Sequence, residues 1–150
     1  MKKFIINSSF HQFYIADREL EPDAPTEWTD ADAANHHLTA KHIAALSPIS
    51  DIEARIISCG PGDSLPEFPD PIDFEVRTEI EVPSGKLGIY GWPWELEDQY
   101  DIAPGTCEIL FRAYATGQVE QGGDYYLVKI EPKKGEQKAP EVNKASYPLP

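Results

Sequence analysis

Residues 73–82, DFEVRTEIEV, alternate between apolar and charged side chains. Successive side chains of a β-strand point to opposite faces of the sheet. One face of this segment therefore carries Phe74, Val76, Thr78, Ile80 and Val82, and the other carries Glu75, Arg77, Glu79 and Glu81. The apolar face requires a covering layer, so the segment predicts a sheet packed on a core. The charged face is either a solvated exterior or a surface that meets a basic partner.

Segments of strand character recur along the chain, at intervals of roughly ten residues in most places. They are residues 2–7, 11–16, 52–59, 73–82, 86–92, 107–115 and 125–132. This spacing predicts a mainly β protein, an antiparallel β-sandwich of about seven short strands, with a partly open barrel as the alternative. The turn residues Pro83, Ser84 and Gly85 predict a hairpin between two of these strands. Four prolines and two glycines make residues 60–71 a long loop.

A single short helix is predicted near residues 29–40. Thr29 can cap its first turn, where Asp30 and Asp32 are favourable near the positive end of the helix dipole. The three histidines of this region, His36, His37 and His42, lack the spacing of four residues that a zinc-binding helix uses. We therefore expect neither a metal site nor a cofactor.

The length of 150 residues suits one domain with an ordinary hydrophobic core. We expect this domain to span residues 1–132 and to be followed by a flexible or loosely docked tail, residues 133–150. The start of the chain is too short in apolar residues for a signal peptide, and no stretch is long enough for a membrane span. The expected location is cytoplasmic, with Cys59 and Cys107 as buried reduced thiols; a bridge between them is possible in an oxidising compartment.

The formal net charge of −13 is concentrated in the predicted domain. Residues 132–150 hold four lysines against two glutamates, which leaves −15 on residues 1–131. Such a charge repels nucleic acids and anionic membranes and attracts a basic protein partner. The alternative is that the acidity serves solubility alone.

The residues offer no clear catalytic arrangement. There is no nucleophile elbow, no glycine-rich phosphate loop and no other familiar catalytic motif. Carboxylate pairs such as Glu79 with Glu81 arise readily by chance in so acidic a chain. We therefore expect a protein that is not an enzyme, and an enzyme or ligand-binding protein with a cleft near Trp92 and Trp94 remains the alternative.

The segment GWPWELEDQYD, residues 91–101, combines two tryptophans and a tyrosine with four carboxylates. Aromatic side chains of this kind often anchor protein interfaces, and surrounding acids suit a partner rich in Arg or Lys. We read the segment as a binding loop and the charged face of residues 73–82 as a steering field. The alternative is that the tryptophans only close the core. The predicted partner-binding residues are Glu75, Glu79, Glu81, Trp92, Trp94, Glu95, Glu97, Asp98 and Tyr100.

Several short motifs resemble known proteins. SSFHQFYIAD at residues 8–17 and EWTDADA at residues 27–33 resemble the opening of the ComJ-type competence nuclease inhibitors. EVPSGKLGIYG, PGTCEILFRAY and GGDYYLVKIEP are similar to a broader group of small bacterial proteins of unassigned function. The resemblance implies an acidic cytoplasmic protein that inhibits a bacterial toxin, most often a nuclease, by occluding its basic active-site cleft. It transfers no site residues, and a β-sandwich interaction module with no toxin partner is the alternative.

Overall fold

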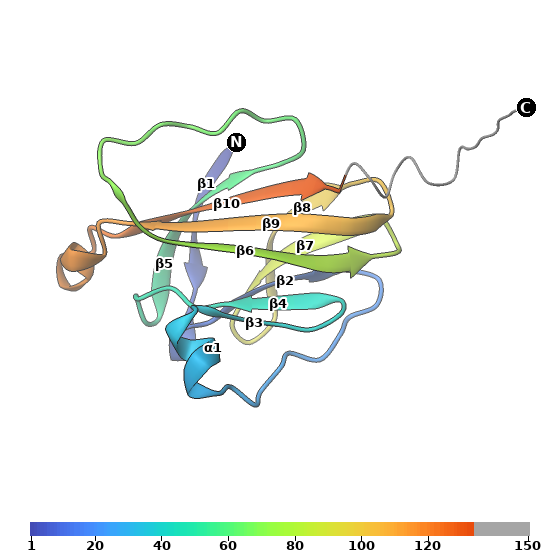
Figure 1. Cartoon of the computed structure of the whole chain (residues 1–150), viewed down its shortest axis with the longest axis horizontal. Helices are drawn as coiled ribbons and strands as arrows, with labels where there is room; N and C mark the ends of the chain where they lie inside the picture. The colour runs from blue at the N-terminus through green and yellow to red at the C-terminus, as the bar shows by residue number, and fades with distance from the viewer. Residues whose placement is uncertain (134–150) are drawn as a thin grey trace, which may run out of the picture.

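Two five-stranded sheets packed face to face make up residues 1–133, the part of the chain that the computed structural model describes (Figure 1). The first sheet runs in the order β1 (Lys2–Asn7), β5 (Glu53–Cys59), β10 (Tyr125–Pro132), β9 (Gly105–Tyr114), β6 (Ile72–Val82). The second runs in the order β3 (His37–Thr39), β4 (Ile43–Leu46), β2 (Phe13–Asp17), β7 (Lys86–Gly91), β8 (Glu95–Asp101). Neighbouring strands in this part of the chain are antiparallel except β5 and β10, which are parallel. The predicted β-sandwich is confirmed.

All seven predicted strands are present, each within two residues of its expected bounds, and β3, β4 and β8 were not foreseen. Strand β6 has the alternation that its sequence indicates. Val76, Ile80 and Val82 are buried between the sheets, and the charged residues between them are exposed. Its long pairing with β9 runs from Ile72 opposite Tyr114 to the end of the strand, with an irregularity near its start.

The turn at Pro83–Gly85 connects the two sheets, so the predicted hairpin is wrong. Strand β6 pairs with β9 in the first sheet, whereas β7 pairs with β2 and β8 in the second. The reason lies in Asp17 at the end of β2, whose carboxylate accepts hydrogen bonds from the backbone N–H and the hydroxyl of Ser84 at 3.1 and 2.8 Å. These contacts hold the turn against the second sheet, and Gly85, at a φ of +72°, allows the tight reversal.

The helix α1 covers only Asp30–Ala34 and is shorter than predicted. Thr29 caps it as expected, in a reciprocal pair of hydrogen bonds with Asp32. The helix stops because His36 adopts a left-handed backbone with a φ of 64° and stacks its ring on Phe74 of β6, with the centroids 3.6 Å apart. The following residues then pair in β3 with β4.

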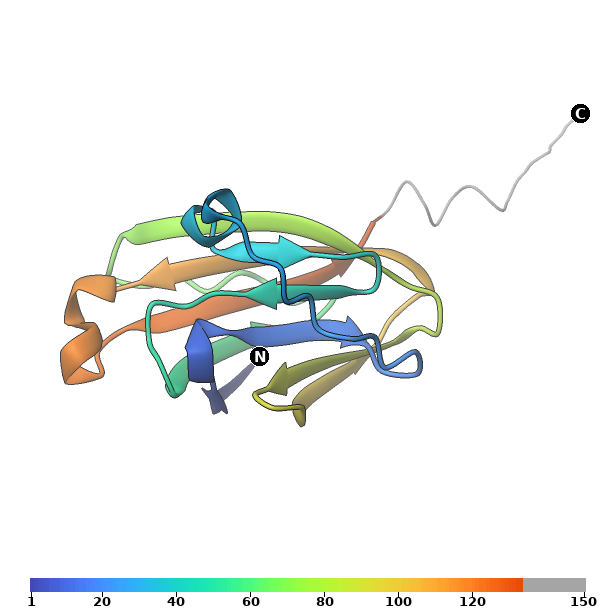
Figure 2. The ribbon, with the colours of Figure 1, turned by 90° about the horizontal axis from the view of Figure 1, so that it is seen from below.

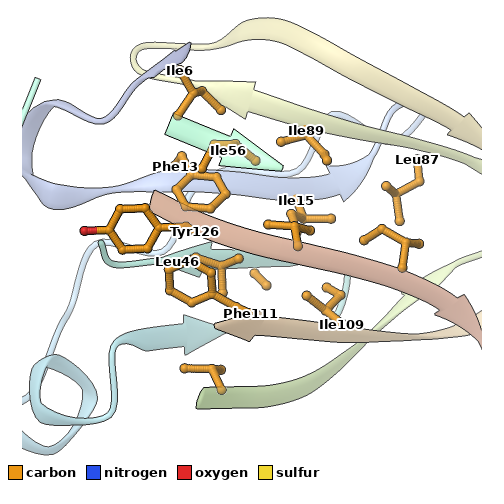
Figure 3. Close-up of a cluster of buried hydrophobic side chains, with 14 of the residues drawn as sticks. Ile6, Phe13, Ile15, Leu46, Ile56, Leu87, Ile89, Ile109, Phe111 and Tyr126 are labelled. Carbon is orange, nitrogen blue, oxygen red and sulfur yellow. The ribbon is translucent and has the colours of Figure 1, made fainter. Parts of the chain in front are cut away.

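The core between the sheets is built from apolar side chains of both layers (Figure 3). Phe111 of β9 lies at its centre and meets the rings of Phe13, Phe74 and Tyr126 at centroid distances of 5.5, 5.8 and 5.7 Å. Cys107 also lies in this core, and burial raises the pKa of its thiol to about 12. Both cysteines of the chain are buried free thiols, as predicted.

Long connections cover the outer faces of the sandwich. The segment between β2 and α1 crosses β4 and β3 (Figure 2). Its Ala24 and Trp28 pack against an outer apolar cluster made of Tyr14, Ala16, Ile43, Ala45 and Tyr90. The loop between β5 and β6 places Phe68 on the outer face of the first sheet. Two short 3-10 turns, Ser9–His11 and Thr116–Gln121, complete the described elements.

Within residues 1–133, no helix is long and apolar enough to cross a membrane. The predicted tail, residues 133–150, lies outside the described residues apart from Lys133. That residue continues the first sheet, because its N–H donates to the carbonyl of Thr106 at 2.9 Å.

Candidate functional site

The predicted binding residues fall into two groups at opposite edges of the sandwich. Strand β6 ends the first sheet and lies over β3 and β4. Strand β8 ends the second sheet and lies beside β1, to which it is joined by an ion pair between Asp98 and Lys2. The predicted binding loop and the charged face of residues 73–82 are therefore separated by the width of the molecule.

The first group lies on the outer face of β6, where each carboxylate has a cationic neighbour. Both oxygens of Glu75 are engaged, at 2.7 Å from Arg112 Nε and 2.8 Å from Arg77 Nε. The hydrogen bond from Arg112 is the largest cause that holds the pKa of Glu75 below its usual range; burial opposes it, and the hydrogen bond and charge of Arg77 assist it. Glu79 meets Lys133 at 3.1 Å, and the carboxylate of Glu81 is 4.0 Å from the ammonium of Lys41.

The second group lies on an edge strand. The residues after Trp94 form β8, paired with β7 through an irregularity at Ile89 and Tyr90. Glu95 and Glu97 are exposed on this strand. The predicted loop is thus a strand whose backbone edge and carboxylates face outward, a geometry that the low strand propensity of acidic residues concealed.

Asp98 and Tyr100 join β8 to the first sheet. The side chain of Asp98 is fully buried, contacts the ammonium of Lys2 and accepts the N–H of Gln99 at 2.8 Å. The hydroxyls of Tyr100 and Ser58 share a hydrogen bond. Burial, opposed by this bond and assisted by the charge of Asp98, raises the pKa of Tyr100 to about 12. These contacts tie the edge strand to the first sheet.

Gly60 provides the space that Tyr100 occupies. A Cβ atom at this position would lie 2.5 Å from Cε1 and 2.8 Å from Cδ1 of the ring. We expect Gly60→Ala to lower the free energy of unfolding by about 1–3 kcal/mol, because the ring must leave its hydrogen bond to Ser58 to relieve the overlap. Urea unfolding measures this, with Gly117→Ala as the control, since nothing lies within 4 Å of a Cβ there. Equal stability of the two variants would contradict this packing.

Trp94 packs onto the outer face of the second sheet. Its ring stacks on Tyr90 with centroids 4.0 Å apart and an interplanar angle of 9°, and it also meets Tyr14 at 5.9 Å. The contacts belong to a small apolar cluster outside the main core. Trp94 therefore presents only part of its surface to a partner.

Trp92 is more open than Trp94, and its neighbour Phe10 was not predicted to take part in binding. Trp92 is 37% exposed and Phe10 is 68% exposed, and their rings meet edge to face with centroids 5.1 Å apart. Hydrophobic periodicity gives no signal for such a residue. The only indication in the sequence is an aromatic residue within the polar segment NSSFH.

Hydrogen bonds donated by backbone N–H groups tie together three loops at this end of the sandwich. The N–H of Trp92 donates to the carbonyl of Asn7 at 2.8 Å, and the N–H of Ser8 donates to the carbonyl of Ile52 at 2.9 Å. The N–H of Phe10 donates to the carboxylate of Asp51 at 3.0 Å. The exposed rings are thus held on a fixed framework.

A hollow of about 380 Å³ opens beside these rings. We call it the aromatic hollow, and it is lined by Phe10, Gln12, Tyr14, Ala24, Pro25, Thr26 and Trp92. The segment that forms one wall belongs to residues 17–32, which hold seven carboxylates against one arginine. The edge strand β8, with its exposed Glu95 and Glu97, starts three residues after Trp92. Aromatic surface and negative charge therefore occur together here.

No group of three or more His, Cys, Asp or Glu side chains that could hold a metal ion occurs among residues 1–133. The clustered histidines have separate contacts. Nδ1 of His37 lies 3.0 Å from the hydroxyl of Thr39, and Nδ1 of His42 lies 2.9 Å from the carbonyl of Glu81.

Comparison with known proteins shows similarity at the level of the fold. No protein-family model matches the chain, and no curated protein matches it in sequence. A solved structure of ComJ from Bacillus subtilis, described as the inhibitor of the DNA degrading activity of NucA, matches 89% of this chain and 96% of its own, with a TM-score of 0.72 and 14% identity. The chain has the ComJ fold. The structure named Crocagin biosynthetic gene J matches 89% of this chain and 99% of its own, with a TM-score of 0.49 and 14% identity.

The sequence resemblance to ComJ-type proteins is therefore confirmed in three dimensions. Two of the segments that carry the resemblance lie near the N-terminus. Residues 8–17 contain the exposed Phe10 and strand β2, and residues 27–33 contain Thr29 and the start of the helix that it caps. At 14% identity the match describes the backbone, and the side chains that meet a partner must be argued from this chain alone.

Proposed function

We propose that this protein binds and inhibits a nuclease, as an immunity or inhibitor protein, by covering a basic active-site cleft with an acidic surface. The observation that carries the proposal is the ComJ fold on a chain with a net charge of −13. Nucleases that bind a polyanion present positive charge around their active sites, and an acidic protein competes for that charge. The proposed setting is the cytoplasm, the partner is a basic protein, and the protein itself performs no catalysis and binds neither nucleic acid nor membrane.

The division of the predicted site suggests which acids contribute. Glu75 is held between two arginines, so a partner must compete with existing ion pairs to reach it. Glu95 and Glu97 stand exposed on an edge strand close to Trp92. We assign the nine predicted residues to one binding function. Glu95, Glu97 and the two tryptophans contact the partner, Asp98 and Tyr100 hold strand β8 in place, and the β6 carboxylates supply long-range attraction.

The test is inhibition of the nuclease encoded beside this gene or captured from the native host. We expect purified protein to block DNA degradation at a one-to-one ratio. The association rate should fall about 10-fold or more between low and high salt, because screening shortens the range of the charges. Surface plasmon resonance measures both rates. Full DNA degradation in the presence of excess protein, with every captured or neighbouring nuclease, would contradict the proposal and leave a general interaction module.

Charge-neutral variants separate the two edges. Glu95→Gln with Glu97→Gln should slow association and speed dissociation. Glu75→Gln with Glu79→Gln and Glu81→Gln should slow association only. If only the β6 substitutions speed dissociation, the partner contacts the first sheet instead.

A further inference from the structure

The aromatic hollow is walled on several sides by rings. Phe10 and Trp92 are exposed at its rim, and Tyr14 lies deeper, with its hydroxyl donating to Oε1 of Gln12 at 3.0 Å. Its volume of about 380 Å³ accepts one large side chain rather than a whole secondary-structure element. The hollow therefore has the size and lining of a pocket for a single residue of a partner.

The backbone conformation at Phe10 is energetically unfavourable. Phe10 and His11 have φ values of 61° and 58°, a left-handed conformation that side chains other than Gly, Asn and Asp seldom adopt. Ile52, on the adjoining loop, has a φ of 78° and is 62% exposed. Strain of this kind persists where surrounding contacts over-determine it, and it concentrates at functional sites. A large exposed ring gains nothing for folding that would offset the strain.

The charge around the hollow selects a cation. The lining residues Ala24, Pro25 and Thr26 are bounded in the chain by Asp23 and Glu27, both within the acidic segment of residues 17–32. An apolar partner side chain would leave this charge unmatched, whereas a cation over an aromatic face is stabilised by the ring and by the carboxylates.

The flatness of the rings selects arginine over lysine. A guanidinium is planar, more weakly hydrated than an ammonium, and stacks on aromatic faces while its N–H groups reach acceptors in its plane. Gln12 lines the hollow with a carbonyl oxygen that has a second lone pair available. The hollow thus offers stacking surface and a hydrogen-bond acceptor together.

A neighbouring hollow of about 350 Å³ shares Phe10 and Gln12 and includes Trp28. The buried indole Nε1 of Trp28 has no hydrogen-bond partner within the described part of the chain. Buried N–H groups without partners are rare in folded proteins. Trp28 does not line the aromatic hollow, so its buried donor is not a contact for the occupant of that hollow.

We propose that the aromatic hollow binds an arginine side chain of a basic protein partner, with Phe10 and Trp92 as its stacking walls. The proposal rests on the proposed function for the identity of that partner, but the pocket itself can be tested without a nuclease. It makes the end of the sandwich, with its three tied loops, the centre of the interface, and the β6 edge peripheral to it.

The test compares hexa-arginine with hexa-lysine peptides, which carry equal charge. Titration at low salt is followed by NMR of the Trp92 indole N–H, assigned with Trp92→Phe. We expect the arginine peptide to bind about 5-fold or more tightly and to shift the Trp92 signal. Equal affinities, or an unchanged Trp92 signal, would overturn the proposal.

Phe10→Gly is the decisive variant, because glycine adopts a φ of 61° freely. We expect it to keep or raise the unfolding temperature and to abolish the preference for arginine, as Trp92→Ala should. Leu96→Ala removes an exposed apolar side chain of β8 outside the hollow and should leave the preference intact. If both Phe10→Gly and Trp92→Ala retain the preference for the arginine peptide, the arginine pocket is overturned. Nuclease inhibition is measured separately and decides the proposed function.

Discussion

Phe111→Ala is expected to lower the free energy of unfolding by about 3–5 kcal/mol, a large share of the 5–15 kcal/mol that holds a typical domain together. The ring is fully buried on β9, the strand between β10 and β6. It contacts Phe13 of the opposite sheet and Tyr126 of its own (Figure 3). It also meets Phe74 of its own sheet. Truncation would leave a cavity that touches both layers, and paired strands on each side prevent the backbone from collapsing into it.

Phe68→Ala is the matched control for this prediction. Its ring also contacts two aromatic rings, those of Tyr114 and Tyr125 at 4.9 and 5.2 Å, but it lies half-buried on the outer face of the first sheet. We expect a loss of about 1–2 kcal/mol, because water fills the vacated space. Urea unfolding followed by near-UV circular dichroism measures both variants. A similar cost at the two positions would show that the core does not lie where the rings converge.

The local sequence pattern predicted those strands that have one face toward solvent and the other toward the core. Strand β6 is the clearest example, since exposed Glu79 alternates with buried Ile80 and places the strand without any tertiary information. Strand β4 reads IAAL and is buried at all four positions, so it has no alternation to detect. Strand β8 is equally hidden, because its acidic residues have low intrinsic strand propensity and its place in the sheet depends on pairing with β7.

Long-range contacts decided the features that local pattern misread. The turn after β6 has the composition of a hairpin turn, but Asp17, 67 residues earlier in the chain, binds Ser84 and directs the turn to the other sheet. This crossing also separates the predicted binding residues into two groups. The tryptophans and acids of residues 91–101 were recognised by composition, whereas Phe10 depends on a backbone geometry fixed by Asp51, which no local pattern encodes.

Asp17→Ala is expected to destabilise the fold by about 3 kcal/mol and to loosen the acidic segment that walls the aromatic hollow. The carboxylate is fully buried. It accepts the N–H groups of Glu19, Leu20 and Ser84 at 2.9, 3.0 and 3.1 Å, and the hydroxyl of Ser84 at 2.8 Å. Each donor that loses a charged acceptor and is left unpaired costs about 1–3 kcal/mol when buried, and less where water reaches it.

Ser84→Ala separates the two roles of Asp17, which are to hold the turn at Ser84 and to organise residues 17–32. The variant removes the hydroxyl donor but keeps all three backbone N–H groups, so we expect a loss of about 1 kcal/mol and an intact acidic segment. Hydrogen exchange at Glu19 and Leu20 reports on that segment. Fast exchange should appear in Asp17→Ala but not in Ser84→Ala, and equal exchange in both would mean that the carboxylate does not organise residues 17–32.

The carboxylate of Asp17 also makes part of the free energy of unfolding depend on pH. Burial alone would raise the pKa of Asp17, but the hydrogen bonds from Ser84, Leu20 and Glu19 outweigh it and hold the pKa below its usual value. A depressed pKa contributes stability that is fully present above the pKa of the unfolded chain, about 3.9, and is lost as the pH falls through the folded pKa. The stability difference between the wild type and Asp17→Asn should therefore be constant from pH 7 to about pH 5 and should shrink below about pH 4. Urea unfolding across this range measures it, and a difference that grew on acidification would show that burial, rather than the hydrogen bonds, governs this group.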